Sequence, residues 1–176
     1  LLASSAASDV YKRQDLYVIG HDNYYKSHDD LSFEDREKLN YDKPESFDNE
    51  MFLKDLLALK AGKEIDMPTY DYNIHTRSKE TIHVVPKKII LIEGILVLYD
   101  ERIRNILDTC VFIDADSDVR LQRRILRDTK ERSRSLESVL TQYIKQVKPM
   151  HEKYVEPTKK YACLLYTSPS PRDPKT

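Results

Sequence analysis

The chain has 176 residues, which is enough for one domain with a hydrophobic core. Its net charge of −1 gives no overall attraction to nucleic acid or to a membrane surface, and no apolar run approaches the roughly 20 residues that span a bilayer. The two cysteines suggest neither a disulfide framework nor a zinc site, so we expect a reducing, cytoplasmic environment.

The two ends of the chain differ in composition from its body. Residues 1–14 are small, polar and aperiodic, and they lack the basic start and apolar core of a signal peptide. Residues 163–176 read CLLYTSPSPRDPKT, and a proline-rich segment without a period is typical of disorder. We interpret both ends as non-native or disordered, and we take residues 15–162 as the folded domain.

A short strand and a polar turn open this domain. Leu16 to Ile19 predict a strand, and Asp22 follows its carboxyl end. Ligands of open α/β sheets sit at the carboxyl ends of strands, although a turn or cap is the simpler interpretation of a lone aspartate. Ser32 and Asp35 resemble a capping box, which predicts a short helix that ends near Leu39.

A longer helix is predicted after the turn at residues 40–44. Asp48 is its expected N-cap, and Gly62 is the expected C′ residue at its other end. Apolar residues at helical spacing should form its buried face. These residues are Phe52, Leu53, Leu56 and Leu57.

A β-hairpin is predicted between residues 67 and 85. Residues 67–72 and 81–85 read as strands, and the polar residues 73–80 read as the linker between them. The hairpin should project from the sheet and carry Tyr70, Tyr72 and His75 on or near it. Packing of the tyrosines on the body of the domain is the alternative interpretation.

The run from Ile89 to Ile92 predicts a strand that is buried on both faces, as in a parallel sheet covered by helices. Glu93 and Gly94 follow it directly. A carboxylate is costly to bury unless it meets a cation or hydrogen-bond donors. Glu93 is therefore either a functional acid or a member of a salt bridge at the end of the strand.

Strands and helices alternate after this point, which indicates a parallel α/β sheet. A short helix is predicted at residues 100–107, a buried strand at residues 110–114, and a helix from Asp116 or Ser117 through Arg127. The last predicted helix begins near Ser135 and should be kinked or ended by Pro149. Its core-facing stripe comprises Leu136, Val139, Leu140, Tyr143 and Val147.

Arginines are dense in and after the helix that begins near residue 117. They are Arg120, Arg123, Arg124, Arg127, Arg132 and Arg134. A solvated helix surface is the usual explanation of such a run. A phosphate clamp is the alternative, because guanidinium groups present a rigid fork that matches phosphoryl oxygens.

Nine short motifs occur in one order along residues 16–162. They read DNYYK, NYDKP, PTYDYNIHTR, IILIEGIL, FIDAD, RLQRRILRD, ERSRS, QY and PTKKYA. In this order they closely resemble the uridine kinases (uridine-cytidine kinases) of the phosphoribulokinase/uridine kinase family of P-loop kinases. The resemblance implies an α/β, parallel-sheet P-loop kinase fold of the nucleoside and nucleotide kinase type, with a projecting β-hairpin and with truncation at both ends.

The resemblance also implies an activity. A member of this family transfers the γ-phosphoryl group of ATP or GTP, with Mg²⁺, to the 5′-hydroxyl of uridine or cytidine. The products are UMP and CMP in pyrimidine salvage. It implies a cytoplasmic homo-oligomer, commonly a tetramer, with no nucleic-acid or membrane partner.

Roles for individual residues follow from the same resemblance. Asp22 is the expected general base and also lies near Mg²⁺, with Glu93 as the second metal-site carboxylate. Arg127 and Arg132 fall in the lid over the phosphates. The expected nucleoside contacts are Tyr25, Asp42, Tyr70, Tyr72, His75, Arg124, Arg134 and Gln142. Among them, Asp42 and Arg124 match ribose contacts, and Tyr70 and His75 match residues that read the pyrimidine.

Two departures from the family pattern matter, and Ser133 is a smaller third. The further strand and helix that the family has after Lys160-Tyr161-Ala162 are replaced by residues 163–176. The P-loop sequence G-x-x-x-x-G-K-[ST] is absent, and the three glycines of the chain cannot form it. We therefore expect an internal fragment of a kinase that is inactive as printed. Ser133 stands where the family usually has a glycine between two arginines.

Two other functions stay open at this point. A sister kinase for ribulose 5-phosphate or pantothenate is one, and the aromatic hairpin argues against it because a sugar phosphate needs no pocket for a base. A catalytically dead nucleoside-binding or oligomerisation module is the other.

Overall fold

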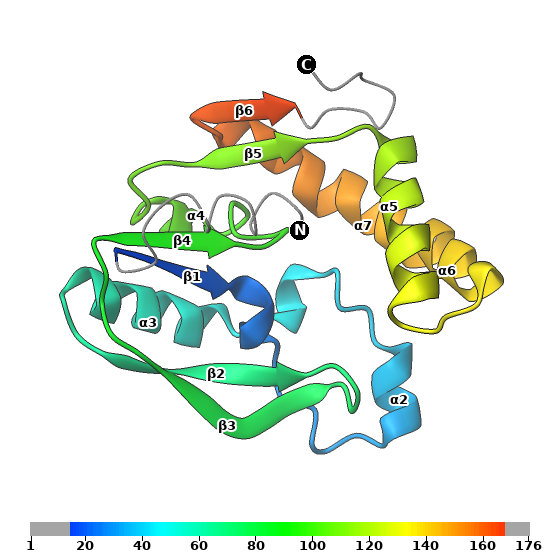
Figure 1. The fold of residues 1–176 in the computed structure, drawn as a ribbon, viewed down its shortest axis with the longest axis horizontal. Helices are drawn as coiled ribbons and strands as arrows, with labels where there is room; N and C mark the ends of the chain where they lie inside the picture. Colours follow the sequence, from blue (N-terminus) through cyan, green and yellow to red (C-terminus); the bar gives the residue numbers. More distant parts are fainter. Residues whose placement is uncertain (1–14, 168–176) are drawn as a thin grey trace. The chain divides into compact units, whose positions relative to one another are not determined.

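The computed structural model describes residues 15–167 (Figure 1). The chain divides into two compact units, Leu1–Ile106 and Leu107–Thr176, and each unit is described by itself. The expectations for residues 1–14 and for residues 168–176 lie outside the described residues. Within residues 15–167, no helix is long and apolar enough to cross a membrane.

Two parallel strands form one of the two sheets in the described part of the first unit. Strand β1 (Leu16–Gly20) pairs with β4 (Ile89–Glu93), and Gly20 lies opposite Glu93 in the register. Residues far apart in sequence are thus joined in parallel, with helices between and after them, which confirms the predicted α/β class. A short helix, α4 (Glu101–Arg104), follows β4 and is capped by Asp100.

The prediction that β4 is buried on both faces is wrong for this unit. Ile89 is 57% exposed and Leu91 is 46% exposed, and Val18 of β1 is exposed as well. Ile19 of β1, by contrast, is fully buried. An unbroken apolar run needs cover on both faces of the sheet, and the described part of this unit supplies it on one face.

The hairpin is confirmed, with a shorter turn than predicted. Strand β2 (Ile65–Asp71) pairs antiparallel with β3 (Thr76–Val84). The second strand therefore begins at Thr76, and residues 76–80 are not the linker that their polarity suggested. Polar residues hid the strand because a two-stranded hairpin exposes much of its surface to water.

The two helices before the hairpin have the predicted caps. Helix α2 (Phe33–Lys38) begins after Ser32, and α3 (Asn49–Lys60) begins after Asp48; each cap side chain accepts a hydrogen bond from a backbone N–H in the first turn. The turns η1 (His21–Tyr24) and η2 (Pro44–Ser46) lie between the regular elements. The helix α3 buries Phe52, Leu56 and Leu59.

One expected member of the α3 face is misplaced. Leu57 is exposed, and Leu59 takes its place in the core. The spacing of Phe52, Leu56 and Leu59 is i, i+4, i+7, which is the narrower stripe that a helix turns toward one neighbour. Gly62, just beyond α3, has a φ of +76°, as expected for a residue that ends a helix.

The second unit contains a second parallel pair. Strand β5 (Val111–Asp114) pairs with β6 (Leu164–Thr167). The prediction of disorder is therefore wrong for residues 164–167, because the apolar segment Leu-Leu-Tyr-Thr before the prolines has good β propensity and finds a partner strand. The predicted burial of β5 is only partly right, since Phe112 is buried but Val111 and Ile113 are exposed.

Helices make up the rest of this unit. Helix α5 (Ser117–Lys130) and helix α6 (Leu136–Gln142) are joined by a short loop (Figure 1). The chain then continues helically through η3 (Tyr143–Val147), α7 (Lys148–Met150), η4 (His151–Val155) and η5 (Glu156–Tyr161). Val139 and Tyr143 face the core as predicted, whereas Leu136 is exposed.

Pro149 does not end this helical run, contrary to one of its two expected effects. Wider π-type turns lie on both sides of it, at Tyr143–Val147 and His151–Val155. Proline lacks an N–H and its ring crowds the preceding turn, so the helix is locally widened and continues.

Candidate functional site

Two carboxylates lie at the carboxyl ends of the parallel strands in the first unit. Asp22 is in η1 directly after β1, and Glu93 is the last residue of β4. A Cβ atom on Gly20 would lie 3.1 Å from Glu93 Oε1, so the glycine lets this carboxylate lie close to the β1 backbone. The structure thus brings the two predicted acids to the same end of the sheet.

A buried histidine fixes the turn that carries Asp22, and the sequence reasoning missed it. His21 is 1% exposed and its ring lies between Phe47 and Phe52, at centroid distances of 4.1 and 4.6 Å. Burial lowers the pKa of His21 to about 4, so the ring is neutral at pH 7. Its Nε2–H donates to Asn49 Oδ1 at 2.9 Å, since that amide oxygen is an acceptor.

Tyr25 lies among groups that the sequence assigned to the nucleoside. Burial raises the pKa of its phenol, and the neighbouring carboxylates of Asp22 and Asp42 raise it further. The ring stacks on Phe47 at 4.3 Å and lies 5.1 Å from Tyr70. The predicted general base and one predicted ribose contact thus act electrostatically on a buried tyrosine that packs against a predicted hairpin residue.

The hairpin residues differ in their exposure. Tyr70 is buried, which agrees with packing on the domain, whereas Tyr72 is exposed beside it at 5.3 Å. His75 lies at the tip and has a φ of +52°, a left-handed conformation that costs a residue with a Cβ atom about 1–2 kcal/mol. Such strain persists where the surrounding structure enforces it, and it is common at functional sites.

Tyr41 completes this group of rings and was missed, although its motif NYDKP had been singled out for Asp42. Its ring stacks on that of His75, with centroids 5.7 Å apart and an interplanar angle of 22°. It also lies 5.5 Å from Tyr25 and 6.3 Å from Tyr70. We call these residues, with Tyr72, the aromatic cluster: Tyr25, Tyr41, Tyr70, Tyr72 and His75.

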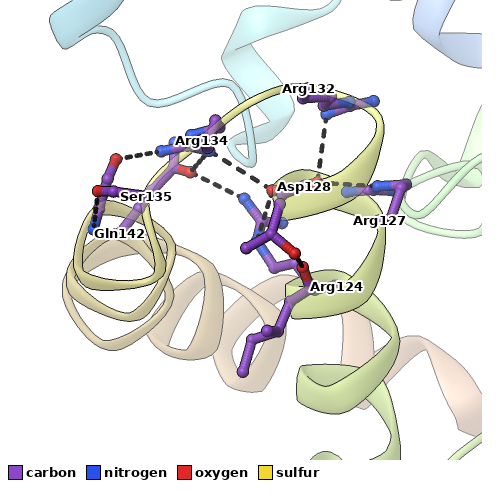
Figure 2. Close-up of polar contacts among 10 residues, drawn as sticks. Arg124, Arg127, Asp128, Arg132, Arg134, Ser135 and Gln142 are labelled. Atoms are coloured by element: carbon purple, nitrogen blue, oxygen red, sulfur yellow. Dashed lines mark hydrogen bonds and ion pairs between the residues drawn. The ribbon is translucent and has the colours of Figure 1, made fainter.

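Arginines of the second unit converge on one carboxylate, as Figure 2 shows. Asp128 of α5 has no exposed surface. Its oxygens lie 2.9 Å from Arg127 Nε and between 3.5 and 3.8 Å from three other guanidinium groups. Those groups belong to Arg124, Arg132 and Arg134.

Gln142 of α6 accepts hydrogen bonds from two of these arginines. Its Oε1 accepts hydrogen bonds from Arg124 Nη2 at 2.9 Å and from Arg134 Nη1 at 2.6 Å. Arg134 Nη2 also donates to Ser138 Oγ at 3.0 Å. Five predicted site residues are thus brought together, and we call them, with Asp128, the arginine cluster: Arg124, Arg127, Asp128, Arg132, Arg134 and Gln142.

The arginine cluster is more than a solvated helix surface. Asp128 was missed, although its i, i+4 spacing from Arg124 and to Arg132 was a readable signal. One carboxylate faces four guanidinium groups, so positive charge is in excess and an anion would be attracted to this region. Ser133, within the loop that carries Arg132 and Arg134, has a φ of +52°.

The chemistry of these groups, rather than a deep cavity, marks the candidate site. One hollow of about 150 Å³ in the second unit is lined by residues that include Arg120, Tyr143 and His151. Another, of about 290 Å³ in the first unit, runs past Phe47 and Asp48. Neither hollow is lined by a residue of the aromatic cluster or of the arginine cluster.

Residues 10–172 match the model of the Phosphoribulokinase / Uridine kinase family. The chain belongs to this family. It is also 47% identical over 162 residues to the uridine kinases of Anoxybacillus flavithermus and Lactococcus lactis subsp. cremoris. The alignment covers 92% of this chain and 77% and 79% of those two proteins.

Solved structures of the family have the same fold. A possible uridine kinase from Bacillus stearothermophilus superimposes with a TM-score of 0.61 at 18% identity, over 94% of this chain and 80% of that one. Phosphoribulokinase from Rhodobacter spheroides superimposes with a TM-score of 0.69 at 11% identity, over 93% of this chain and 64% of that one. The predicted P-loop kinase fold is therefore confirmed, and family membership indicates a kinase, which is a phosphotransferase.

Proposed function

We propose that this chain carries the nucleoside site and the catalytic base of a uridine and cytidine kinase. That enzyme transfers the γ-phosphoryl group of ATP or GTP to the nucleoside 5′-hydroxyl and makes UMP or CMP for pyrimidine salvage. The observation that carries the proposal is the buried position of Tyr25, whose ring lies 5.1 Å from the hairpin ring of Tyr70 and whose phenol is within electrostatic reach of the Asp22 and Asp42 carboxylates. Support also comes from relatives of 47% identity that are named uridine kinases.

Each group of residues has a role suited to its chemistry. In the first unit, Asp22 would accept the proton of the 5′-hydroxyl, Asp42 would contact the ribose, and Tyr70 and His75 would read the pyrimidine beside Tyr25 and Tyr72. In the second unit, the family resemblance assigns Arg124 to the ribose, and it assigns Arg134 and Gln142 to nucleoside binding. Arg127 and Arg132 would stabilise the charge that moves between phosphates, which is most of what the protein contributes to phosphoryl transfer.

The carboxylates suit a shared Mg²⁺ rather than a cage made by the protein alone. No group of three or more His, Cys, Asp or Glu side chains suited to a metal occurs within residues 15–167. Mg²⁺ in kinases commonly uses one or two carboxylates and takes its other ligands from phosphates and water. Asp22 and Glu93 would hold it, and when bound the ion would neutralise the charge of the phosphates.

The 176 residues contain no P-loop, so the chain alone should not turn over ATP. An acceptor such as a sugar phosphate is less consistent with the aromatic cluster than a nucleoside is, because rings stack on a base and a sugar phosphate has none. A non-catalytic nucleoside-binding module is the other candidate, and it predicts binding without phosphorylation. We further propose a cytoplasmic homo-oligomer, on the same family grounds.

The test is phosphorylation of uridine by a completed kinase, in which residues 15–162 are joined to a P-loop segment of a uridine kinase. We expect ATP-dependent formation of UMP, and we expect Asp22→Asn to lower kcat by about 10²–10⁴ because a positioned base is lost from an otherwise isosteric side chain. Asp30→Asn, the same change at an exposed aspartate, is the matched control.

If the kcat of Asp22→Asn lay within threefold of that of the unmodified enzyme, Asp22 would not be the catalytic base. Binding of uridine without any phosphorylation would favour the non-catalytic module. ATP-dependent turnover by the 176-residue chain itself would contradict the need for the missing P-loop.

A further inference from the structure

The first residue of β3 ties the hairpin tip to the segment after η1. Thr76 is 4% exposed, and its hydroxyl donates to Asp29 Oδ1 at 2.9 Å. The same hydroxyl accepts a hydrogen bond from the backbone N–H of His28 at 3.1 Å. Ser27 Oγ donates to the other oxygen of Asp29, Oδ2, at 2.7 Å. The buried hydroxyl therefore donates one hydrogen bond and accepts one, and both partners lie outside the hairpin.

Arg36 of α2 ties the other side of the tip. Its Nε–H is shared between the carbonyl oxygens of His28 and Leu31, at 2.8 and 3.0 Å. Its Nη1 donates to the carbonyl oxygen of Ile74 at 3.1 Å. Since these partners are backbone carbonyls rather than carboxylates, the guanidinium group works as a structural cross-link between α2 and the hairpin.

His75 lies between these two ties. The residue before it is held through its carbonyl oxygen and the residue after it through its side chain, while its own backbone is left-handed. A strained residue relaxes unless its neighbours are fixed. The hydrogen bonds on both sides of His75 therefore offset the free-energy cost of its left-handed backbone. They also fix the stacking of His75 on Tyr41, whose hydroxyl donates to the carbonyl oxygen of Arg36 at 3.0 Å.

We propose that Thr76 is a positioning residue for nucleoside recognition, acting with Asp29 and Arg36 as a brace on the hairpin tip. The proposal rests on the proposed function, in which His75 reads the base. Thr76 itself does not contact the nucleoside; it holds His75 in the conformation that binds. A preformed site loses less conformational entropy on binding, so loss of the brace should weaken affinity without removing any contact to the ligand.

The experiment compares three variants of the 176-residue chain. Thr76→Val keeps the shape and removes the hydroxyl, Thr76→Ser keeps the hydroxyl, and Thr81→Val makes the same change at an exposed position of β3. Uridine affinity is measured by calorimetry, and backbone amide exchange is followed by mass spectrometry at residues 73–77 and over the rest of the first unit.

We expect Thr76→Val to weaken uridine binding roughly tenfold, the effect of one buried hydrogen bond, and to speed exchange selectively at residues 73–77. Thr76→Ser should restore affinity to within about threefold, and Thr81→Val should change neither readout.

Unchanged affinity and exchange in Thr76→Val would overturn the brace. Exchange that is faster throughout the first unit would also overturn it, because Thr76 would then be a residue of general stability. Failure of the unmodified chain to bind uridine, together with faster exchange at the tip of Thr76→Val, would instead overturn the nucleoside as the ligand and leave the mechanical tie standing.

Discussion

The aromatic cluster and the arginine cluster are held in place by different forces. Rings in the first stack on one another, and the hairpin tip beside them is tied by hydrogen bonds of Arg36 to the backbone and of the buried Thr76 hydroxyl to the His28 N–H and the Asp29 carboxylate. The second is collected around the single charge of Asp128, and three of its four ion pairs are longer than 3.4 Å. A packed, hydrogen-bonded site keeps its geometry without a ligand, whereas like charges around one counter-ion rearrange easily when an anion arrives.

The two clusters share one local feature. Among residues 15–167, the non-glycine residues with positive φ are His75, in the aromatic cluster, and Ser133, in the loop between Arg132 and Arg134 of the arginine cluster. In the hairpin the strain is opposed by ties on both sides. In the loop between α5 and α6, Ser133 is held mainly by the hydrogen bond that the backbone N–H of Arg134 donates to the carbonyl oxygen of Asp128, at 3.1 Å.

The two clusters would not have separate roles if substitutions in both changed the same kinetic constant. In the completed kinase, we expect Arg127→Ala to lower kcat by about 10²-fold with a small effect on the KM for uridine, because its charge acts mainly in the transition state. We expect His75→Ala to raise the KM for uridine about tenfold, with a smaller loss of kcat.

Arg124→Ala is the control for this pair, because Arg124 is on the same helix as Arg127 but is assigned to the ribose and should change KM. Steady-state kinetics with uridine varied at saturating ATP measures all three variants. If His75→Ala lost only kcat and Arg127→Ala lost only uridine binding, the assignments of the two clusters would be reversed.

Removal of the central charge should test how far the arginine cluster depends on it. Asp128→Asn should lower the free energy of unfolding of the second unit by about 3 kcal/mol, since four guanidinium groups lose a buried counter-ion. Asp118→Asn, at an exposed aspartate in the first turn of the same helix, should cost under about 1 kcal/mol.

Urea unfolding and exchange of the Arg134 amide give two readings of this effect. Equal losses in the two variants would show that the ion pairs to Asp128 contribute little to the stability of the second unit.

The smallest expected effect concerns the strained loop. Ser133→Gly should raise the free energy of unfolding by about 0.5–1 kcal/mol, because glycine adopts a positive φ without a steric cost. Ser138→Gly, the same change inside α6, should lower it by at least this amount, because glycine disfavours the helix and the hydrogen bond from Arg134 is lost as well. Thermal denaturation of both variants measures the sign, and destabilisation by Ser133→Gly would mean that its strain is offset by contacts of the side chain.

Local patterns predicted the elements well, and they failed where tertiary cover decides. The caps at Ser32 and Asp48, the hairpin and the two parallel strand segments were readable because spacing and turn chemistry are local. The burial of β4 was overestimated because an apolar run does not say which neighbours cover it. The strand β6 was missed because the proline-rich residues after it dominated the composition of the segment.

The residues of the candidate site were likewise predictable where local sequence identified them and missed where tertiary contacts define their roles. Motifs supplied Asp22, Tyr70 and the arginines, since these residues are conspicuous by type and position. His21, Tyr41 and Asp128 were missed because their roles come from contacts: two rings on either side of His21, a stack on His75, and four cations around Asp128. A single carboxylate within an arginine run looks like surface charge until the fold buries it.

Gly94 changes how variation among relatives should be interpreted. A Cβ atom at this position would lie 2.6 Å from His21 Cβ, which is closer than side chains approach, so any replacement must displace the turn that carries Asp22. Selection would therefore keep this glycine even in a descendant that had lost its kinase activity but still folded. An invariant Gly94 reports packing, whereas variation at Asp22 beside an unchanged Gly94 would identify a pseudoenzyme.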